Sequence, residues 1–190
     1  MTDASADVRE LARELVSIPS HDGEREAGDR IEAWLREHTA ADVTRDDAGV
    51  DEGRGGNVVA RKGSGDTTLA LVGHHDVVPP DASQVTDDGD YVVETAGEGA
   101  GRRLSGRGSA DMKGAVAAAM CAFRDSEVGS SGDRTESGDA DPGDGVELVF
   151  ASFVGEEAGG VGARAAIDRG FEPDYAVVGE GSTGYSAPGV

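Results

Sequence analysis

The fold of this chain is decided by the stretch Leu69-Ala70-Leu71-Val72-Gly73-His74-His75-Asp76-Val77-Val78-Pro79. Its first four residues are apolar on both faces of an extended chain, as is typical of a strand in the middle of a covered sheet. Side chains alternate along such a backbone, so His74 and Asp76 point the same way and His75 points the other way. If one imidazole nitrogen of His74 binds a metal ion, Asp76 can accept a hydrogen bond from the other nitrogen. The alternative interpretation is a pair of exposed loop histidines.

Patterns on either side of this stretch predict strands that alternate with helices. We expect helices over residues 7–18, 23–38, 111–123 and 162–168. We expect strands over residues 43–45, 57–61, 68–72, 146–154 and 175–178, the last of them buried. This alternation predicts an α/β domain with a mostly parallel central sheet and helices on both faces. Residues 50–56 and 126–145 lack periodicity, and we expect flexible insertions there.

The composition restricts the partners of the protein. The chain has 190 residues, enough for one domain with a core, and a formal net charge of −21 from 38 acidic and 17 basic side chains. Such a surface repels nucleic acid and anionic membranes, so neither is expected as a partner. The acidic residues are dispersed over the whole chain, and only Lys62 and Lys113 are lysines. A dispersed acidic surface suits high salt, where self-repulsion is screened, and we expect a halophilic protein.

The sequence predicts neither a membrane span nor a secretion signal. The longest apolar run, Ala115–Phe123, is shorter than the roughly 20 residues that a transmembrane helix needs. The first residues are acidic, where a signal peptide is basic and then apolar. The single Cys121 excludes an intrachain disulfide framework. We therefore expect a cytoplasmic protein.

His74 follows the predicted strand over 68–72, and acidic residues stand at similar places near the later strands. Asp111 precedes an Ala-rich helix, Glu156 and Glu157 follow the strand over 146–154, and Glu180 follows the last strand. The carboxyl ends of strands in an open α/β sheet form the edge where ligands bind. We therefore expect these side chains to converge with His74 at one edge.

Each of these acids also has a structural interpretation. Asp111 is placed either to cap the following helix or to bridge two cations with its two oxygens. Glu156 and Glu157 fit the first turn of a helix as well as a metal and a substrate water, and Glu180 fits a turn. A set of His, Asp and Glu without a thiolate suits Zn²⁺, Co²⁺ or Mn²⁺ more than a structural zinc site.

Taken together, these clusters resemble the signatures of one family, the co-catalytic metallopeptidases and amidohydrolases that include acetylornithine deacetylase, succinyl-diaminopimelate desuccinylase, aminoacylase and glutamate carboxypeptidase. The segments that match, in order, are Gly73–Pro79, Gly106–Gly114, Glu156-Glu157 and Val178-Gly179-Glu180. The stretch Ser17-Ile18-Pro19-Ser20 is also similar. The match runs from about residue 8 to residue 183, apart from the two insertions, and departs from the family's pattern at Gly181, where the family usually has proline.

The resemblance implies a role for each matching residue. It implies two divalent metal ions, Zn²⁺ first and Co²⁺ or Mn²⁺ as alternatives. His74 would bind one ion together with Glu180, Glu157 would bind the second, and Asp111 would bridge both. Asp76 would orient His74. Glu156 would be the general base.

The resemblance also implies the reaction, metal-dependent hydrolysis of the amide bond of a small N-acyl amino acid, as in a deacetylase or desuccinylase. A dipeptidase or carboxypeptidase of the same family, acting on a short peptide, is one alternative. A fragment that only binds metal is the other, because residues 1–190 resemble the N-terminal part of the catalytic domain and the family members are about twice as long. The lid or dimerisation domain and the last histidine ligand would lie beyond Val190, and the full-length parent would be a homodimer. We expect His21 and His38 to be surface residues.

Overall fold

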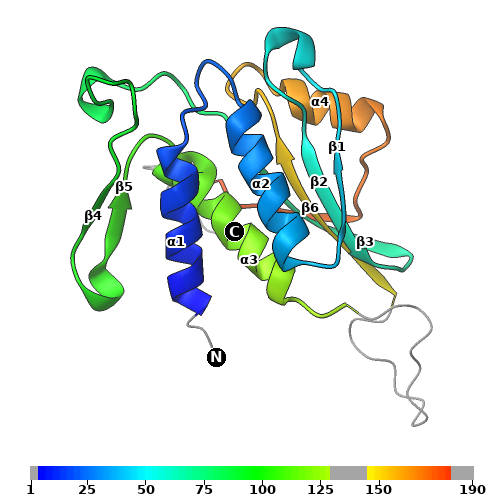
Figure 1. Cartoon of the computed structure of the whole chain (residues 1–190). Coiled ribbons are helices and arrows are strands. Elements are labelled where there is room, and N and C mark those ends of the chain that lie inside the picture. Colours follow the sequence, from blue (N-terminus) through cyan, green and yellow to red (C-terminus); the bar gives the residue numbers. More distant parts are fainter. Residues whose placement is uncertain (1–3, 129–144, 181–190) are drawn as a thin grey trace, which may run out of the picture.

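The computed structural model of the chain describes residues 4–128 and 145–180 (Figure 1). Its longer helices are α1 (Ala4–Ser17), α2 (Arg25–His38), α3 (Gly114–Asp125) and α4 (Val161–Asp168). The strands are β1 (Asp42–Arg45), β2 (Val58–Gly63), β3 (Thr67–His74), β4 (Glu94–Ala96), β5 (Arg103–Ser105), β6 (Val146–Phe153) and β7 (Tyr175–Val178). Short helical segments cover Val50–Glu52, Ala82–Gln84, Gly99–Gly101 and Ser109–Lys113.

The central sheet has the strand order β1-β2-β6-β3-β7. The pairs β1–β2 and β2–β6 are antiparallel, whereas β3 runs parallel to both β6 and β7. Only β2 therefore runs against the other strands of this sheet, which confirms the predicted α/β sheet while making it mixed. The register pairs His74 with Phe153, and Val72 with Val178, so β3, β6 and β7 end at one edge.

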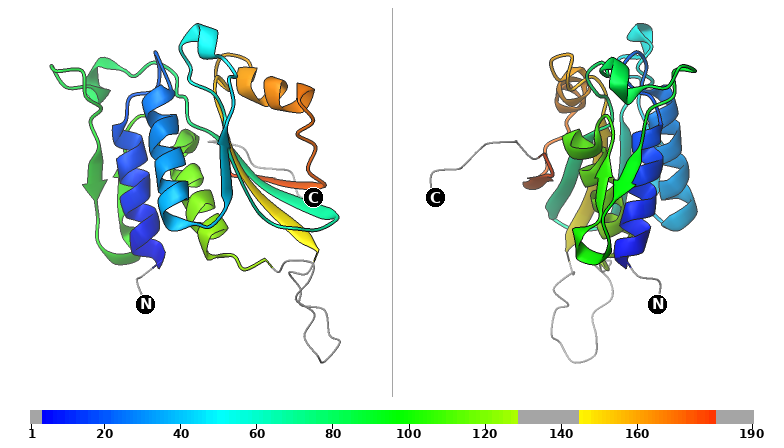
Figure 2. Two further views of the ribbon diagram at one scale, coloured as in Figure 1. Left: turned by 45° about the vertical axis from the view of Figure 1, so that its right-hand side comes forward. Right: turned by 90° about the vertical axis from the view of Figure 1, so that its left-hand side faces the viewer.

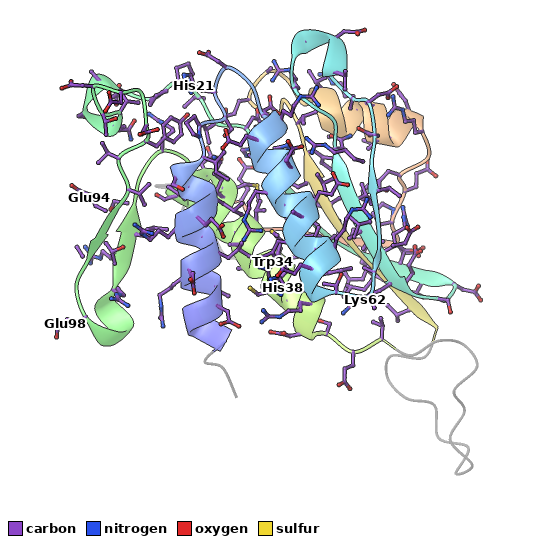
Figure 3. The ribbon with its side chains drawn as sticks, viewed as in Figure 1. His21, Trp34, His38, Lys62, Glu94 and Glu98 are labelled. Carbon is purple, nitrogen blue, oxygen red and sulfur yellow. The ribbon has the colours of Figure 1, made fainter. Side chains whose placement is uncertain are left out.

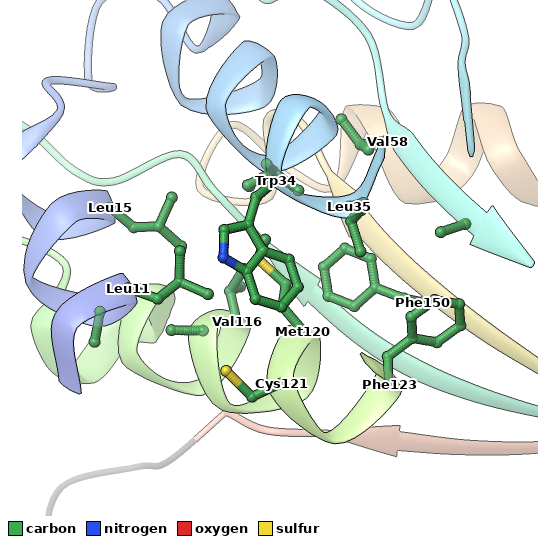
Figure 4. Packing of buried hydrophobic residues seen from close by; sticks show 14 of the residues in the cluster. Leu11, Leu15, Trp34, Leu35, Val58, Val116, Met120, Cys121, Phe123 and Phe150 are labelled. Carbon is green, nitrogen blue, oxygen red and sulfur yellow. The ribbon is translucent and has the colours of Figure 1, made fainter. Parts of the chain in front are cut away.

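Helices cover the two faces of the sheet unequally. In the views of Figures 1 and 2, α1, α2 and α3 lie on one side of the sheet and α4 lies on the other. The larger core cluster joins the first three helices to the sheet, and its members include Leu11, Leu15, Trp34, Leu35, Met120, Phe123 and Phe150 (Figure 4). Phe153 of β6 instead packs with Ala166 of α4 and, edge to face, with Phe171. The prediction of helices on both faces is confirmed.

The prediction that residues 175–178 form a buried strand is wrong in one respect. The strand forms, but Tyr175, Val177 and Val178 are 65%, 55% and 57% exposed. β7 lies at the end of the sheet, and α4 packs over β6 rather than over β7. An apolar run predicts a preference for burial, but it does not show which element covers the strand.

Two further segments differ from the sequence patterns. The helix expected over 111–123 begins only at Gly114, because Asp111 and Met112 have non-helical backbone angles. The hairpin of β4 and β5 lies in a region for which the patterns predict no strand. Of the two expected insertions, residues 50–52 form a short helix, and most of 126–145 lies outside the described residues.

In the part of the chain that the structure describes, no helix is both long and apolar enough to cross a bilayer.

Candidate metal centre

The site is built around His74, the last residue of β3. This side chain is 2% exposed, and its Nδ1 atom lies 3.1 Å from the main-chain oxygen and 3.2 Å from Oδ1 of Asp76. Its Nε2 atom lies 3.1 Å from Oδ1 of Asp111 and 3.9 Å from Oε2 of Glu156. One ring nitrogen is therefore fixed by its own strand end, and the other faces carboxylates from two distant segments.

Asp111 reaches this position from the irregular turn Ser109–Lys113. The turn follows Gly108, whose φ of 79° is a left-handed conformation that suits glycine, and the Asp111–Met112 peptide bond is cis. The helix α3 begins three residues later, and no side chain caps it. The capping interpretation of Asp111 is therefore wrong. Its carboxylate, 54% exposed, contacts His74 instead.

Asp76 connects His74 to the two glutamates. Its carboxylate is 3% exposed, and its oxygens accept hydrogen bonds from the main-chain N–H groups of Glu156 (3.1 Å) and Glu157 (3.0 Å). Burial raises the pKa of Asp76, but His74 and these two N–H groups outweigh burial and hold that pKa below its ordinary value. The side chains of Glu156 and Glu157 are exposed. One buried carboxylate thus fixes the backbone of the turn and leaves the glutamate side chains free to face a ligand.

The electrostatics of the site are those of a buried base among acids. Burial alone would lower the pKa of His74, but the carboxylates of Asp76, Asp111 and Glu156 raise it to about 9. Burial, and then the nearby Asp111, raises the pKa of Glu157. A concentration of carboxylates of this kind is stabilised by a cation.

Not all of the predicted ligands are brought together. Glu180 is exposed and lies two residues after Val178, as His74 lies two residues after its partner Val72, so the two occupy the same edge of the sheet. Within residues 4–128 and 145–180, no group of three or more His, Cys, Asp and Glu side chains is arranged to hold a metal ion. The structure therefore joins His74 to Asp111, with Glu156 nearby, and leaves the full set of ligands a prediction.

The other histidines lie away from this contact. The buried His75 contacts Oγ of Ser152 through Nδ1 at 2.8 Å, and burial lowers its pKa to about 3. His21 is about one quarter exposed and stacks on Tyr91, so it is less of a surface residue than expected. His38, 40% exposed, lies at the end of α2 beside Trp34, whereas His21 lies in the segment that precedes this helix (Figure 3).

Three buried polar residues support the site without having been predicted. Lys113, 1% exposed, donates a hydrogen bond of 2.6 Å to the main-chain oxygen of Ile18, and burial lowers its pKa to about 7. Glu24 and Asn57 bond to the main chain around the Glu156–Glu157 turn. The signal for Asn57 was available, since this polar residue directly precedes the apolar run Val58-Val59-Ala60. Glu24 stands among other acids in the sequence, and nothing in the pattern separates it from surface acids.

The profile of peptidase family M20/M25/M40 matches residues 70–188, which include His74 and all the candidate acids. The chain belongs to this family. It is 37% identical over 184 residues to a [LysW]-lysine hydrolase of Deinococcus radiodurans, which covers 95% of this chain and 41% of that protein. It is 32% identical over 181 residues to a succinyl-diaminopimelate desuccinylase of Rhizorhabdus wittichii, covering 92% of this chain and 42% of that one. This M20 chain therefore spans about two fifths of the length of these relatives.

A solved structure supports the same fold. The crystal structure of a tripeptidase from Staphylococcus aureus superposes with a TM-score of 0.65 at 21% identity, over 95% of this chain and 44% of the tripeptidase. At this identity the similarity shows the fold alone. The family profile and the fold therefore agree in placing the chain in the M20 family.

Proposed function

We propose that this chain supplies metal ligands and the general base of an amidohydrolase that acts on a small N-acyl amino acid. The observation that carries the proposal is the contact between Nε2 of His74 and the carboxylate of Asp111 at 3.1 Å. It joins two of the predicted ligands from segments that are 37 residues apart. Glu156 lies within 3.9 Å of the same nitrogen, where a general base is needed.

The donor atoms fit a divalent cation. An imidazole nitrogen and carboxylate oxygens, without a thiolate, suit Zn²⁺, and Co²⁺ or Mn²⁺ are alternatives. Two ligand atoms bound tetrahedrally at about 2.0–2.1 Å from one zinc ion lie roughly 3.3 Å apart. The observed spacing of 3.1 Å is close to this value. In the proposal His74 and Glu180 would hold one ion, Glu157 would hold a second, and Asp111 would supply a carboxylate to both.

The residues around these ligands divide the chemistry between them. Divalent ions here would polarise the amide carbonyl and lower the pKa of water. Glu156 takes a proton from the attacking water and passes it to the leaving amine nitrogen. Asp76 accepts a hydrogen bond from Nδ1–H of His74, so Nε2 is the nitrogen that would bind a metal ion, and its proton would be released on binding. No covalent nucleophile is required.

The substrate class rests on the relatives and on the chemistry of the site. One relative is named as a desuccinylase and the other as a hydrolase of [LysW]-lysine, which supports an acylated amino acid as substrate. Because the chain spans about two fifths of these relatives, the activity is proposed for a protein that contains this chain together with the remaining length of the family.

The experiment is a calorimetric titration of the 190-residue chain with Zn²⁺ and Co²⁺. We expect His74→Ala to weaken binding at least tenfold, about 1.4 kcal/mol. His38→Ala is the matched control, because it removes another histidine at the end of α2 and leaves β3 intact. Equal affinities for the two variants would contradict the proposed metal centre. Assays of the longer protein with N-acetyl and N-succinyl amino acids and with dipeptides would then separate deacylase from dipeptidase activity.

A further inference from the structure

The turn that carries Glu156 and Glu157 is held through three consecutive N–H groups. Those of Glu156 and Glu157 donate to Asp76, as described above. The N–H of Gly155 donates to Oε2 of Glu24 at 2.8 Å, across 131 residues of sequence. The side chain of Glu24 is 3% exposed. A second buried carboxylate, from the segment before α2, therefore holds the start of the same turn.

Glu24 has a cationic partner that also touches the turn. Nη1 of Arg54 lies 2.5 Å from Oε1 of Glu24, and Nε of Arg54 lies 2.9 Å from Glu52. Gly155 has a φ of 60°, and a Cβ there would stand 3.1 Å from Nη1 of Arg54. The guanidinium therefore packs against the α-carbon of Gly155 while it neutralises Glu24. A buried carboxylate without such a partner would be costly.

The flanks of the turn are fixed separately. Oδ1 of Asn57 accepts the N–H of Val154 at 3.0 Å, and Nδ2 of Asn57 donates to the main-chain oxygen of Gly162 at 3.0 Å. Nδ2 also donates to Asp46 at 2.8 Å. Asn57 holds both flanks, and the main-chain oxygens of Gly155 and Glu156 accept hydrogen bonds from N–H groups of residues 159–161. The N–H groups of residues 155–157, in contrast, bond only to side chains, those of Glu24 and Asp76, among the bonds that the described residues show.

We propose that Glu24, paired with Arg54, is a positioning residue that sets the direction of the Glu156 and Glu157 side chains through the N–H of Gly155. This inference rests on the proposed function, because it assigns Glu24 a role towards the base and one metal ligand. Glu24 touches neither substrate nor metal in this arrangement. Its contribution is to keep the backbone from rotating at the residue before the two glutamates, whose side chains are exposed.

Amide exchange in the 190-residue chain, followed by NMR, tests the inference directly. Glu24→Ala should speed exchange at Gly155 at least tenfold relative to amides of the core strand β6, and should shift the Gly155 proton resonance upfield. Glu24→Gln should retain most of the protection, because its amide oxygen still accepts the bond. Glu14→Ala is the matched control, since it removes a carboxylate with an arginine partner, Arg30 at 2.6 Å, that connects α1 to α2. It should leave Gly155 unchanged.

Metal affinity provides the second readout. Removing a residue that orients metal ligands typically costs about 10–100-fold in affinity. Glu24→Ala should weaken Co²⁺ binding by about tenfold, within that range, while Glu24→Gln and Glu14→Ala stay within about threefold. Unchanged Gly155 exchange and unchanged affinity in Glu24→Ala would overturn the inference. If Glu24→Ala does not fold, Arg54→Met replaces it. This change removes the partner that holds the Glu24 carboxylate in place, so exchange at Gly155 should again speed up. If the unmodified chain binds no metal, the proposed function fails, and the exchange data alone decide whether Glu24 holds the turn.

Discussion

Nε2 of His74 lies 3.1 Å from Oδ1 of Asp111, a contact made by the last residue of a buried strand and by an irregular turn before a helix. It depends on the length of β3, which continues through His74 instead of ending at Val72, and on the late start of α3 at Gly114. A helix beginning at Asp111 would use that carboxylate as a cap. The late start frees the carboxylate for His74.

This contact predicts the effect of replacing Asp111. Asp111→Asn keeps the size of the side chain but removes the charge that the proposed bridging role requires, so the affinity for Zn²⁺ should fall at least tenfold, about 1.4 kcal/mol. Asp125→Asn, which removes a carboxylate paired with Arg124, is the control and should bind as the unmodified chain does. Calorimetry measures both. Equal affinity in the two variants would remove Asp111 from the list of ligands.

Replacing Glu156 and replacing Glu157 should have different effects on metal binding and on turnover. Glu156→Gln should keep metal affinity within about threefold, because Glu156 is assigned proton transfer and not metal binding. In the longer protein the same change should lower turnover by about 10²–10⁴-fold. Glu157→Gln should weaken metal binding in the 190-residue chain. Retained turnover in Glu156→Gln would show that another group is the base.

The sequence was informative about the elements and the edge of the sheet where the site lies. Periodicity located the helices and strands, because amphipathic faces repeat regularly whatever their partner is. His74, Asp76 and Asp111 could be selected because several polar segments were expected to converge at one edge of the sheet. Alone, an Asp before a helix is a common N-cap. The roles of these residues remain predictions, since they came from the resemblance to a family.

The rest depended on long-range contacts that no local pattern contains. Glu24 binds Gly155 across 131 residues, and in the sequence it is one acid among 38. The exposure of β7 depends on which elements lie beside it, and its apolar residues predicted the opposite. The late start of α3 follows from the backbone angles of Asp111 and Met112, whereas helix propensity favoured an earlier one.

The buried Glu24 should give the protein a measurable pH dependence. Burial, and then the Asp76 carboxylate, raises its pKa from 4.5 to about 7. Between these values the folded state holds a proton that the unfolded state has lost, so this group's contribution to stability is complete below about pH 4.5 and is lost as the pH rises to about 7. Glu24→Gln stays neutral throughout. As the pH rises from about 4.5 to about 7, the free energy of unfolding of Glu24→Gln should therefore increase relative to that of the unmodified chain, by up to about 3 kcal/mol.

Urea unfolding at several pH values, at one fixed KCl concentration, measures this difference. Glu14→Gln is the control, because its carboxylate is 44% exposed in its ion pair with Arg30. A difference between Glu24→Gln and the unmodified chain that is the same at pH 5 and pH 8 would contradict the raised pKa.

The core cluster predicts unequal effects of two apolar truncations. Phe150 is fully buried, with its ring 6.3 Å from that of Phe123, and Phe150→Ala should lower the free energy of unfolding by about 3–5 kcal/mol. Ile167 on α4 is 57% exposed, and Ile167→Ala should change it by no more than about 0.5 kcal/mol. Denaturant melts of the 190-residue chain measure both values. Similar losses in the two variants would mean that Ile167 is covered in solution.

The net charge of −21 predicts that salt stabilises the folded chain. Screening weakens exposed ion pairs, such as Arg36–Glu32 at 2.8 Å, each worth about 0.3–0.5 kcal/mol. It also weakens the repulsion among 38 acidic side chains, which outnumber the 17 basic ones by 21. The Debye length falls from about 10 Å at 0.1 M to about 3 Å at 1 M, so most of that repulsion is removed at molar KCl.

The melting temperature should therefore rise between these KCl concentrations. Sucrose at an equal concentration is the control, because it is an excluded solute that does not screen charges. A melting temperature that stays constant or falls in KCl would refute salt adaptation, because the lost ion pairs would then outweigh the relieved repulsion.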